Sequence, residues 1–408
     1  MLSVSEAEAI ILDLVQPLEK IETVTLENAS RRILAHPVSS PLDFPYWDNS
    51  AMDGYAVRYE DLRGCDRANP KILRIIEEIP AGIQPQKTIA SGEAARIFTG
   101  AVMPQGADTI VMQENTQRDG DRVTILQAPG DREFVRHKGA FYQSGNALLG
   151  SGIAIGAPEI AVLATAQCTQ FSVYRRPRVA IFSTGNELIA PGNALQPGQI
   201  VDSNQYALRA FVSDLGAIPV PLGIVRDRPE DLEATIKKAI ADADLVLSTG
   251  GVSVGEYDYI EEILAKLGGK IYIRSVAVKP GKPLTVATFE QEKRTCLYFG
   301  IPGNPVSALV SCWRFVQPAL KKLSGLGGDW QPKFVMARSR HDLSASGTRE
   351  TYLWGRWDII NGGYEFSLAE GDRSSGNLMN LAQTNGLAIV PVGETAIAAG
   401  EKVCVMLV

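Results

Sequence analysis

The sequence has few of the residues that bind structural metals or attach haem. Its 408 residues include five cysteines, at positions 65, 168, 296, 312 and 404, and three histidines, at 36, 137 and 341. The cysteines are widely spaced and form no CxxC pair, which argues against a structural zinc site or a haem attachment. Reduced thiols, as in a cytoplasmic protein, are therefore expected.

The chain also lacks concentrated basic charge and long apolar runs. Its formal net charge is −6, and no run of lysine or arginine exceeds two residues. A sequence-independent nucleic-acid interface needs a basic face, so this partner is disfavoured. The N-terminus has neither the basic lead nor the long apolar core of a signal peptide, and Ser3 with Glu6 predicts the capping box of a first helix instead. We expect the chain to remain in the cytoplasm, away from membranes.

The spacing of apolar and turn residues divides the chain into regions of different kinds. Residues 20–175 are β-rich, with short apolar runs between Gly, Pro and Asp turns. From Pro177 onward strands alternate with helices, which indicates a doubly wound, mostly parallel α/β sheet. The predicted strands are 178–183, 218–225, 244–248, 270–278, 284–289 and 296–301, and the predicted helices are 204–215, 229–242, 257–267 and 305 to about 323. A glycine-rich segment, 324–332, precedes a small all-β domain.

Glycine-rich loops that carry a carboxylate, a lysine or a hydroxyl follow strands of the α/β region. They read FSTGNE (182–187), LGIVRDRP (222–229), STGGVSVGEYDY (248–259), KPGKP (279–283) and GIPGNPVS (300–307). Open α/β sheets bind ligands just beyond the carboxyl ends of their strands. The loops therefore predict one crevice for a phosphate-bearing ligand and a metal.

The first three loops supply the glycines and acids of this predicted crevice. Gly250, Gly251 and Gly255 would let the backbone approach a phosphate near Ser253. Three carboxylates at one sheet edge suit Mg²⁺, which takes a few hard oxygens and keeps water and phosphate as its other ligands. These carboxylates are Glu187, Asp227 and Asp258. Other interpretations stay open: a purely structural turn, a solvated Glu187, or Asp227 as a helix cap.

The last two loops supply cations and a hydroxyl. Lys279 and Lys282 lie on a backbone stiffened by prolines and suit an oxyanion, although a solvated turn is the common alternative. Ser307, in the first helical turn after Pro305, would add a hydroxyl and free amides, while Asn304 is predicted to cap the helix.

Other candidates lie outside the α/β region. Asp53 and Thr99 fit ordinary turns when taken alone, and Arg349 and Ser375 are plausible oxyanion ligands or plain surface residues.

Taken together, these motifs resemble the molybdopterin molybdenumtransferase family, the MoeA and gephyrin E-domain proteins. The resemblance covers essentially the whole chain, through DNSAMDGYAV, TGAVMP, FSTGNEL, STGGVSVGEYDY, KPGKP and GIPGNPVSAL in the family's order. It implies an α+β subdomain I (1–40 and 140–176), a β-rich subdomain II (41–139), an α/β molybdopterin-binding subdomain III (177–324) and a C-terminal β-barrel subdomain IV (325–408).

The resemblance also implies a reaction and an assembly. Adenylated molybdopterin and molybdate would give molybdenum cofactor and AMP, with Mg²⁺. The site would lie between the subunits of an elongated homodimer, and an upstream adenylyltransferase and molybdoenzyme apoproteins or cofactor carriers are possible further partners. By motif position the functional residues would be Asp53, Thr99, Arg136, Glu187, Asp227, Asp258, Lys279, Pro302 and Pro305, with Lys282, Ser307, Arg349 and Ser375 forming the molybdate pocket.

Two positions depart from the family's pattern. Phe141 stands where members often have an acidic residue, and Ser275 stands where a second lysine often precedes KPGKP.

Two other functions remain as alternatives. A molybdopterin adenylyltransferase shares the STGG-type loop, but such enzymes are usually lone α/β domains. A non-catalytic scaffold of the gephyrin type would suit a long disordered linker or a fused module, which this sequence lacks.

Overall fold

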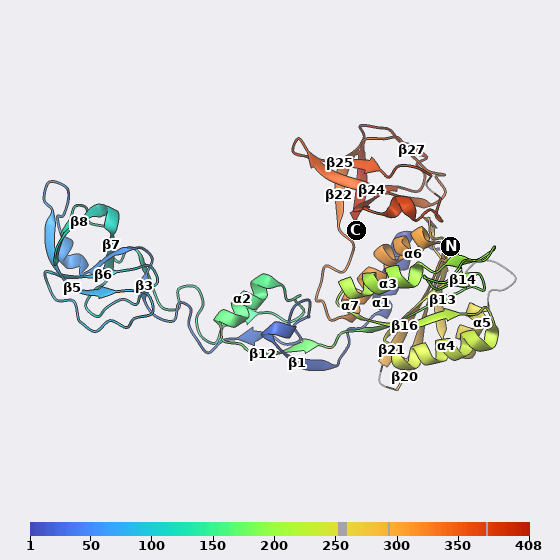
Figure 1. Ribbon diagram of the computed structural model, residues 1–408, viewed down its shortest axis with the longest axis horizontal. Coiled ribbons are helices and arrows are strands. Elements are labelled where there is room, and N and C mark those ends of the chain that lie inside the picture. The colour runs from blue at the N-terminus through green and yellow to red at the C-terminus, as the bar shows by residue number, and fades with distance from the viewer. Residues whose placement is uncertain (252–258, 293, 373) are drawn as a thin grey trace. The chain divides into compact units, whose positions relative to one another are not determined.

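The computed structural model describes residues 1–251, 259–292, 294–372 and 374–408. The chain forms two compact units (Figure 1). Unit 1 comprises Met1–His36, Ser151–Ala157 and Gln170–Val408, and unit 2 comprises Pro37–Gly150 and Pro158–Thr169. The subdomain boundaries drawn from the sequence stay predictions.

A six-stranded sheet organises the first part of unit 1. Its order is β16 (Ile218–Val225), β13 (Arg178–Thr184), β17 (Leu245–Thr249), β21 (Arg294–Ile301), β20 (Pro283–Gln291) and β18 (Lys270–Ser275). The first four strands run parallel, and β20 runs antiparallel to both of its neighbours. The predicted mostly parallel sheet is confirmed.

Alternating apolar residues give this sheet two buried faces. In β13, Val179 and Ile181 join one core cluster, whereas Ala180 and Phe182 join the other, as the period of two along a strand requires. Helices cover both faces (Figure 1). The first face packs on α1 (Val4–Leu14), α3 (Asn204–Asp214), α6 (Pro305–Ser311) and α7 (Gln317–Leu323), and the second on α4 (Pro229–Asp242) and α5 (Ile260–Lys266). The predicted capping box of Ser3 and Glu6 is present at α1.

The predicted strand 270–278 is wrong in one respect, because two strands occupy this range. β18 ends at Ser275, and β19 (Val278–Lys279) leaves the sheet to pair with β24 (Glu350–Ile360). The backbone of Leu2 fills the break, since its N–H donates to Ser275 O at 3.2 Å and its carbonyl accepts from Ala277 N at 2.7 Å. A contact from the opposite end of the chain therefore redirects the strand.

The predicted helix from 305 to about 323 is also interrupted. A π-helical segment, Cys312–Val316, separates α6 from α7. Pro318 follows it. A proline inside a helix cannot donate to the carbonyl four residues earlier and clashes with it, so the widened turn accommodates the ring.

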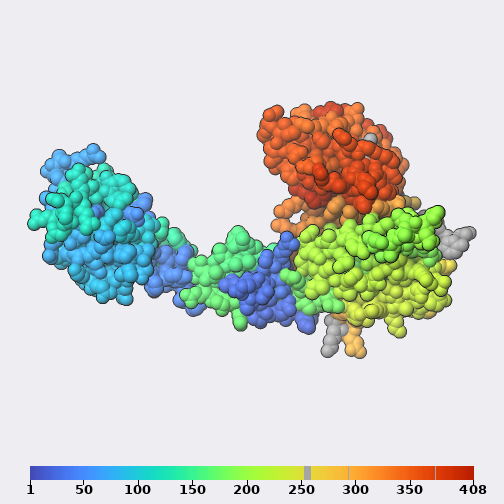
Figure 2. Space-filling model, in the orientation of Figure 1, coloured from blue at the N-terminus to red at the C-terminus, as the bar shows by residue number. Residues whose placement is uncertain are grey.

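The C-terminal part of unit 1 is a closed five-stranded barrel, as predicted. Its strands follow the order β24, β25 (Gly363–Leu368), β22 (Phe334–Ser339), β28 (Lys402–Leu407) and β26 (Gly386–Val390), and β26 pairs back to β24. Tyr352 and Trp354 bury their rings in the same core cluster as the α/β helices. In Figure 2 the red barrel accordingly lies directly on the orange and green α/β residues.

Unit 2 is built on a second six-stranded sheet, with its own core around Tyr55, Val57 and Val111. The sheet order is β7 (Thr109–Met112), β4 (Gly54–Val57), β6 (Glu93–Ile97), β5 (Lys71–Ile79), β9 (Arg122–Ile125) and β8 (Thr116–Asp119). Both units also contain short two-stranded sheets. These pair β1 (Ile21–Thr25) with β12 (Gln170–Tyr174), β2 (Val38–Ser39) with β11 (Ala147–Leu149), β3 (Asn49–Ser50) with β10 (Val135–Arg136), β14 (Leu188–Ile189) with β15 (Ile200–Val201), and β23 (Leu343–Ser344) with β27 (Ala396–Ile397). Helix α2 spans Ala157–Thr165.

No helix in the described part of the chain combines the length and apolar character that crossing a membrane requires.

Candidate active site

A pocket of about 1050 Å³ lies at the carboxyl ends of β13, β16 and β17 in unit 1. Residues from all five glycine-rich loops line it, so the predicted single crevice is present. The predicted site residues that it contains are Glu187, Asp227, Gly250, Gly251, Lys279, Lys282, Pro302, Pro305, Ser307, Arg349 and Ser375. Ser253, Gly255 and Asp258 lie outside the described residues.

Asp227 is held from two sides at one end of the pocket. The Thr184 hydroxyl donates to its Oδ1, and the Asn186 backbone N–H donates to its Oδ2 at 3.3 Å. Helix α4 starts after Arg228 without a side-chain cap. The interpretation of Asp227 as a helix cap is therefore wrong, and its carboxylate belongs to the pocket.

Glu187 lies against a glycine that makes room for it. A Cβ added to Gly185 would stand 2.8 Å from each carboxylate oxygen of Glu187, closer than real contacts allow. Glu187 is exposed to solvent and lines the pocket. Its carboxylate is thus folded back over the loop yet open to a ligand.

The donor set at this end fits magnesium. Two carboxylates from neighbouring strand ends, with room for water and phosphate oxygens, match the way proteins bind Mg²⁺. The described ranges contain no group of three or more His, Cys, Asp or Glu side chains placed to hold a metal. Softer metals that require nitrogen or sulfur ligands are not what this set favours. We call Glu187 and Asp227 the acidic end of the pocket.

The glycines of the STGG loop are required by conformation and by space. Gly250 has φ = 88°, and a Cβ there would lie 2.3 Å from the Thr184 carbonyl oxygen. Gly251 has φ = 64°, and its Cβ would lie 3.0 Å from Ile260 Cγ1. Only glycine allows this backbone to lie so close to the end of β13.

Cations gather at the other end of the pocket, where two domains of unit 1 meet. The parallel pairing of β19 with β24 sets Lys279 opposite Thr351, and Arg349 Nη1 donates to the Val278 carbonyl at 3.3 Å. Lys279 and Lys282 are exposed, whereas Ser307 is buried. We call Lys282, Ser307, Arg349 and Ser375 the basic end.

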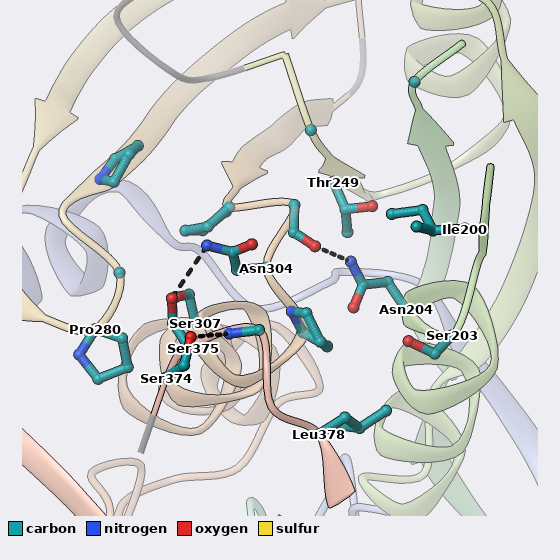
Figure 3. Close-up of a pocket in the computed structure, with 18 of the residues that line it drawn as sticks. Ile200, Ser203, Asn204, Thr249, Pro280, Asn304, Ser307, Ser374, Ser375 and Leu378 are labelled. Carbon is teal, nitrogen blue, oxygen red and sulfur yellow. Dashed lines mark hydrogen bonds between the residues drawn. The ribbon is translucent and has the colours of Figure 1, made fainter. Parts of the chain in front are cut away.

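Two asparagine amides fix the loops between these ends (Figure 3). Asn304 Nδ2 donates to Ser375 Oγ at 3.1 Å, and Asn204 Nδ2 donates to the Gly303 carbonyl at 2.7 Å. Asn304 occupies the predicted N-cap position of α6, but its side chain does not cap the helix, because its amide reaches the barrel loop instead. Sequence reasoning did not identify Asn204 or Thr184, although Thr184 lies within the FSTGNE motif.

Asp53, Thr99 and Arg136 lie in unit 2. Asp53 Oδ1 accepts from the Thr99 backbone N–H at 2.7 Å and from its hydroxyl at 2.8 Å. The backbone hydrogen bond, followed by that of the hydroxyl, lowers the pKa of Asp53 below its ordinary value. Arg136 lies in β10 opposite Asn49. The two turns predicted separately thus form one carboxylate–threonine unit.

The structure shows what surrounds Phe141 and Ser275, the two positions that depart from the family's pattern. Phe141 is 65% exposed and its ring lies 5.8 Å from that of Phe44. Ser275 closes β18 opposite Pro283. An aromatic contact therefore replaces the carboxylate at the first position, and a strand end replaces the lysine at the second.

The fold and the pocket define a class of protein: a doubly wound α/β domain joined to a β-barrel, with carboxylates and cations lining one pocket. Three models of known protein families match successive parts of the chain. Residues 2–166 match the MoeA N-terminal region (domain I and II), 180–322 match a probable molybdopterin binding domain, and 336–408 match the MoeA C-terminal region (domain IV).

Relatives match over nearly their full length. A protein of Nostoc sp. named molybdopterin molybdenumtransferase is 57% identical, over 100% of this chain and 94% of its own. One of the same name from Haemophilus influenzae is 31% identical, over 99% of this chain and 98% of its own. The crystal structure of a molybdopterin biosynthesis MoeA protein from Pyrococcus horikosii superposes with a TM-score of 0.81 at 30% identity, covering 100% of this chain and 99% of the other. The chain belongs to the molybdopterin molybdenumtransferase family.

Proposed function

We propose that the protein inserts molybdenum into molybdopterin during cofactor biosynthesis, using molybdate and adenylated molybdopterin and releasing AMP in a Mg²⁺-dependent reaction. The observation that supports this proposal is that one pocket is lined by carboxylates from the loops after β13 and β16 and by cations from the loop between β18 and β20 and from the barrel, while β16 and β18 are opposite edges of the sheet. A substrate with a phosphoanhydride and a second substrate that is an oxyanion require these two environments side by side.

The acidic end would hold magnesium and the phosphoanhydride. Glu187 and Asp227, with Asp258 by motif position, are the proposed ligands. Magnesium bound there would neutralise charge on the link between molybdopterin and AMP. The glycine backbone at 250–251 lets a phosphate approach its amides, and Lys279 would stabilise charge that builds on the leaving AMP.

The basic end would hold molybdate, a tetrahedral dianion. Lys282 and Arg349 supply positive charge, and Ser307 and Ser375 supply hydroxyl donors. Pro302 and Pro305 bracket the loop that carries Asn304. The described lining residues include no cysteine or histidine, so we assign the pocket a binding and electrostatic role and no covalent nucleophile.

The most direct test measures AMP release from adenylated molybdopterin, with and without molybdate and with and without Mg²⁺. The proposal expects AMP and molybdenum cofactor to appear together, only when both are present. AMP release at the same rate without molybdate would contradict insertion as described. ATP-dependent release of pyrophosphate with plain molybdopterin would favour an adenylyltransferase instead.

We further propose that the chain acts as a homodimer whose sites are composite. Asp53, Thr99 and Arg136 of one subunit would complete the pocket of the other. All three residues are exposed in the single chain, so their side chains are free to contact a ligand bound to another subunit.

Mixing two inactive variants tests this arrangement. D53A and D227A proteins, allowed to exchange subunits, would form hybrid dimers with one intact site, and about a quarter of full activity would return. No recovery after demonstrated exchange would place both residues in the same subunit's site or outside it.

A further inference from the structure

We propose that Thr184 is the positioning residue of the acidic end: its hydroxyl orients Asp227, while the rest of the residue sets the STGG loop. This inference rests on the proposed metal role of Asp227. It concerns how one buried side chain at the end of β13 joins three of the five loops.

The hydroxyl contact is specific. Thr184 is 4% exposed, and its Oγ1 donates to Asp227 Oδ1. Asp227 is half-buried and comes from a different strand end, after β16. The only other donor that the described residues give this carboxylate is the backbone N–H of Asn186, at 3.3 Å. Removing the hydroxyl therefore takes away one of the two restraints that the described residues place on the carboxylate's orientation.

The remaining atoms of Thr184 contact the glycines. Its carbonyl oxygen lies 2.3 Å from where a Gly250 Cβ would stand, and its methyl carbon lies 3.1 Å from where a Gly251 Cβ would stand. Both glycines are therefore packed on Thr184 as closely as a side-chain-free backbone allows. The hydroxyl and the methyl group have separable partners, one a carboxylate and the other a glycine loop.

Outer-shell partners of metal ligands characteristically affect metal affinity, because they set the direction of the donor atoms. A Thr184→Val variant keeps the shape and the methyl contacts but loses the hydroxyl. Thr184→Ser keeps the hydroxyl and loses the methyl group. This pair separates orientation of Asp227 from packing of the loop.

The experiment measures Mn²⁺ binding to the full-length protein by electron paramagnetic resonance in the presence of AMP, with Mn²⁺ as the probe for the magnesium site. Asp227→Asn serves as the comparator. Thr288→Val serves as the matched control, because Thr288 is also 4% exposed and lies in β20 of the same sheet but does not line the pocket. The Mg²⁺ concentration that half-activates AMP release is measured on the same proteins.

We expect T184V to weaken Mn²⁺ binding and to raise the half-activating Mg²⁺ concentration by about tenfold or more, approaching D227N. T184S and T288V should stay within about twofold of the unmodified protein. Thr184→Ala, which removes the same hydroxyl, provides a second measurement should the valine variant not fold, as judged by its melting curve.

Two results would overturn the inference in different ways. If D227N loses Mn²⁺ and T184V binds it normally, the metal site stands and Thr184 does not position it. If D227N itself binds Mn²⁺ normally, the proposed metal role of Asp227 is wrong, and the inference about Thr184 falls with it.

Discussion

The two ends of the pocket are assembled differently. The acidic end comes from loops that follow neighbouring parallel strands, β13 and β16, within one domain. The basic end joins Lys282 and Ser307 of the α/β domain to Arg349 and Ser375 of the barrel. Sheet topology alone therefore places the carboxylates, whereas the proposed oxyanion ligands depend on how two domains dock.

The α/β domain and the barrel share an apolar core that includes Tyr352 and Trp354. Near the basic end they are also joined by polar contacts, which include the two-residue pairing of β19 with β24, the Arg349–Val278 hydrogen bond, and the contacts of Ser375 with Asn304 and with Val306 N. In the proposed function the acidic end holds the metal and the phosphoanhydride, and the basic end holds molybdate. Changes at the acidic end should therefore stop chemistry outright, while changes at the basic end should act through the affinity for molybdate.

The largest effect is expected at the acidic end. D227A or E187Q should lower AMP release by about 100- to 1000-fold, the usual loss when a preorganised electrostatic group is removed. Single-turnover assays at saturating molybdate provide the measurement. Activity close to that of the unmodified protein in either variant would remove that residue from the metal site.

At the basic end, K282A should raise the half-saturating molybdate concentration by about tenfold, because a charge-assisted contact worth about 1.5 kcal/mol is lost. Lys238, exposed on α4, provides the control K238A, which should change nothing. Equal effects of K282A and K238A would show that only general charge matters.

The close approach of Gly185 to the Glu187 carboxylate predicts a steric effect. G185A should displace the carboxylate and lower AMP release by about tenfold, since the new Cβ would lie 2.8 Å from both of its oxygens. Gly328 has nothing within 4 Å of its virtual Cβ, so G328A is the matched control. Steady-state kinetics of both proteins check this, and an active G185A would mean that Glu187 need not stay in place.

The Asn304–Ser375 hydrogen bond between the α/β domain and the barrel predicts a smaller effect. N304A should raise the half-saturating molybdate concentration by about threefold, the cost of one neutral hydrogen bond of roughly 0.6 kcal/mol. Because Asn304 would act through Ser375, the double variant N304A/S375A should be no worse than S375A alone. Fully additive losses would separate the two residues.

The smallest effect concerns pH. Thr99 donates two hydrogen bonds that lower the pKa of Asp53, and T99V removes only that of the hydroxyl. A lowered pKa keeps the carboxylate ionised as the pH falls, so in T99V the acid limb of the rate profile should move to higher pH. An unchanged limb would show that ionised Asp53 does not contribute.

The contrast between the two ends also marks what the sequence could predict. Local pattern was enough for the alternating strands and helices, for the loops at their carboxyl ends, and hence for Glu187 and Asp227 in one pocket. These features follow from periodicity and sheet topology, which a sequence carries along its length. For the C-terminal region, local pattern predicted only a small all-β domain, and the barrel was implied by the resemblance to the family.

Long-range contacts were missed. The break at Ser275 depends on Leu2, and the direction of the Asn304 amide depends on Ser375, about seventy residues away. The Thr184 hydroxyl could equally have bonded its own strand, and only the position of Asp227 decides where it points. Such choices are made by tertiary packing, which local propensity does not encode.

The central claim, that one pocket divides metal binding from oxyanion binding, is tested most directly by equilibrium binding of radioactive molybdate. The measurement compares D227A with K282A/R349A in the full-length protein. We predict that D227A binds molybdate as the unmodified protein does while K282A/R349A loses it. Normal binding by K282A/R349A, or loss in D227A alone, would contradict the account.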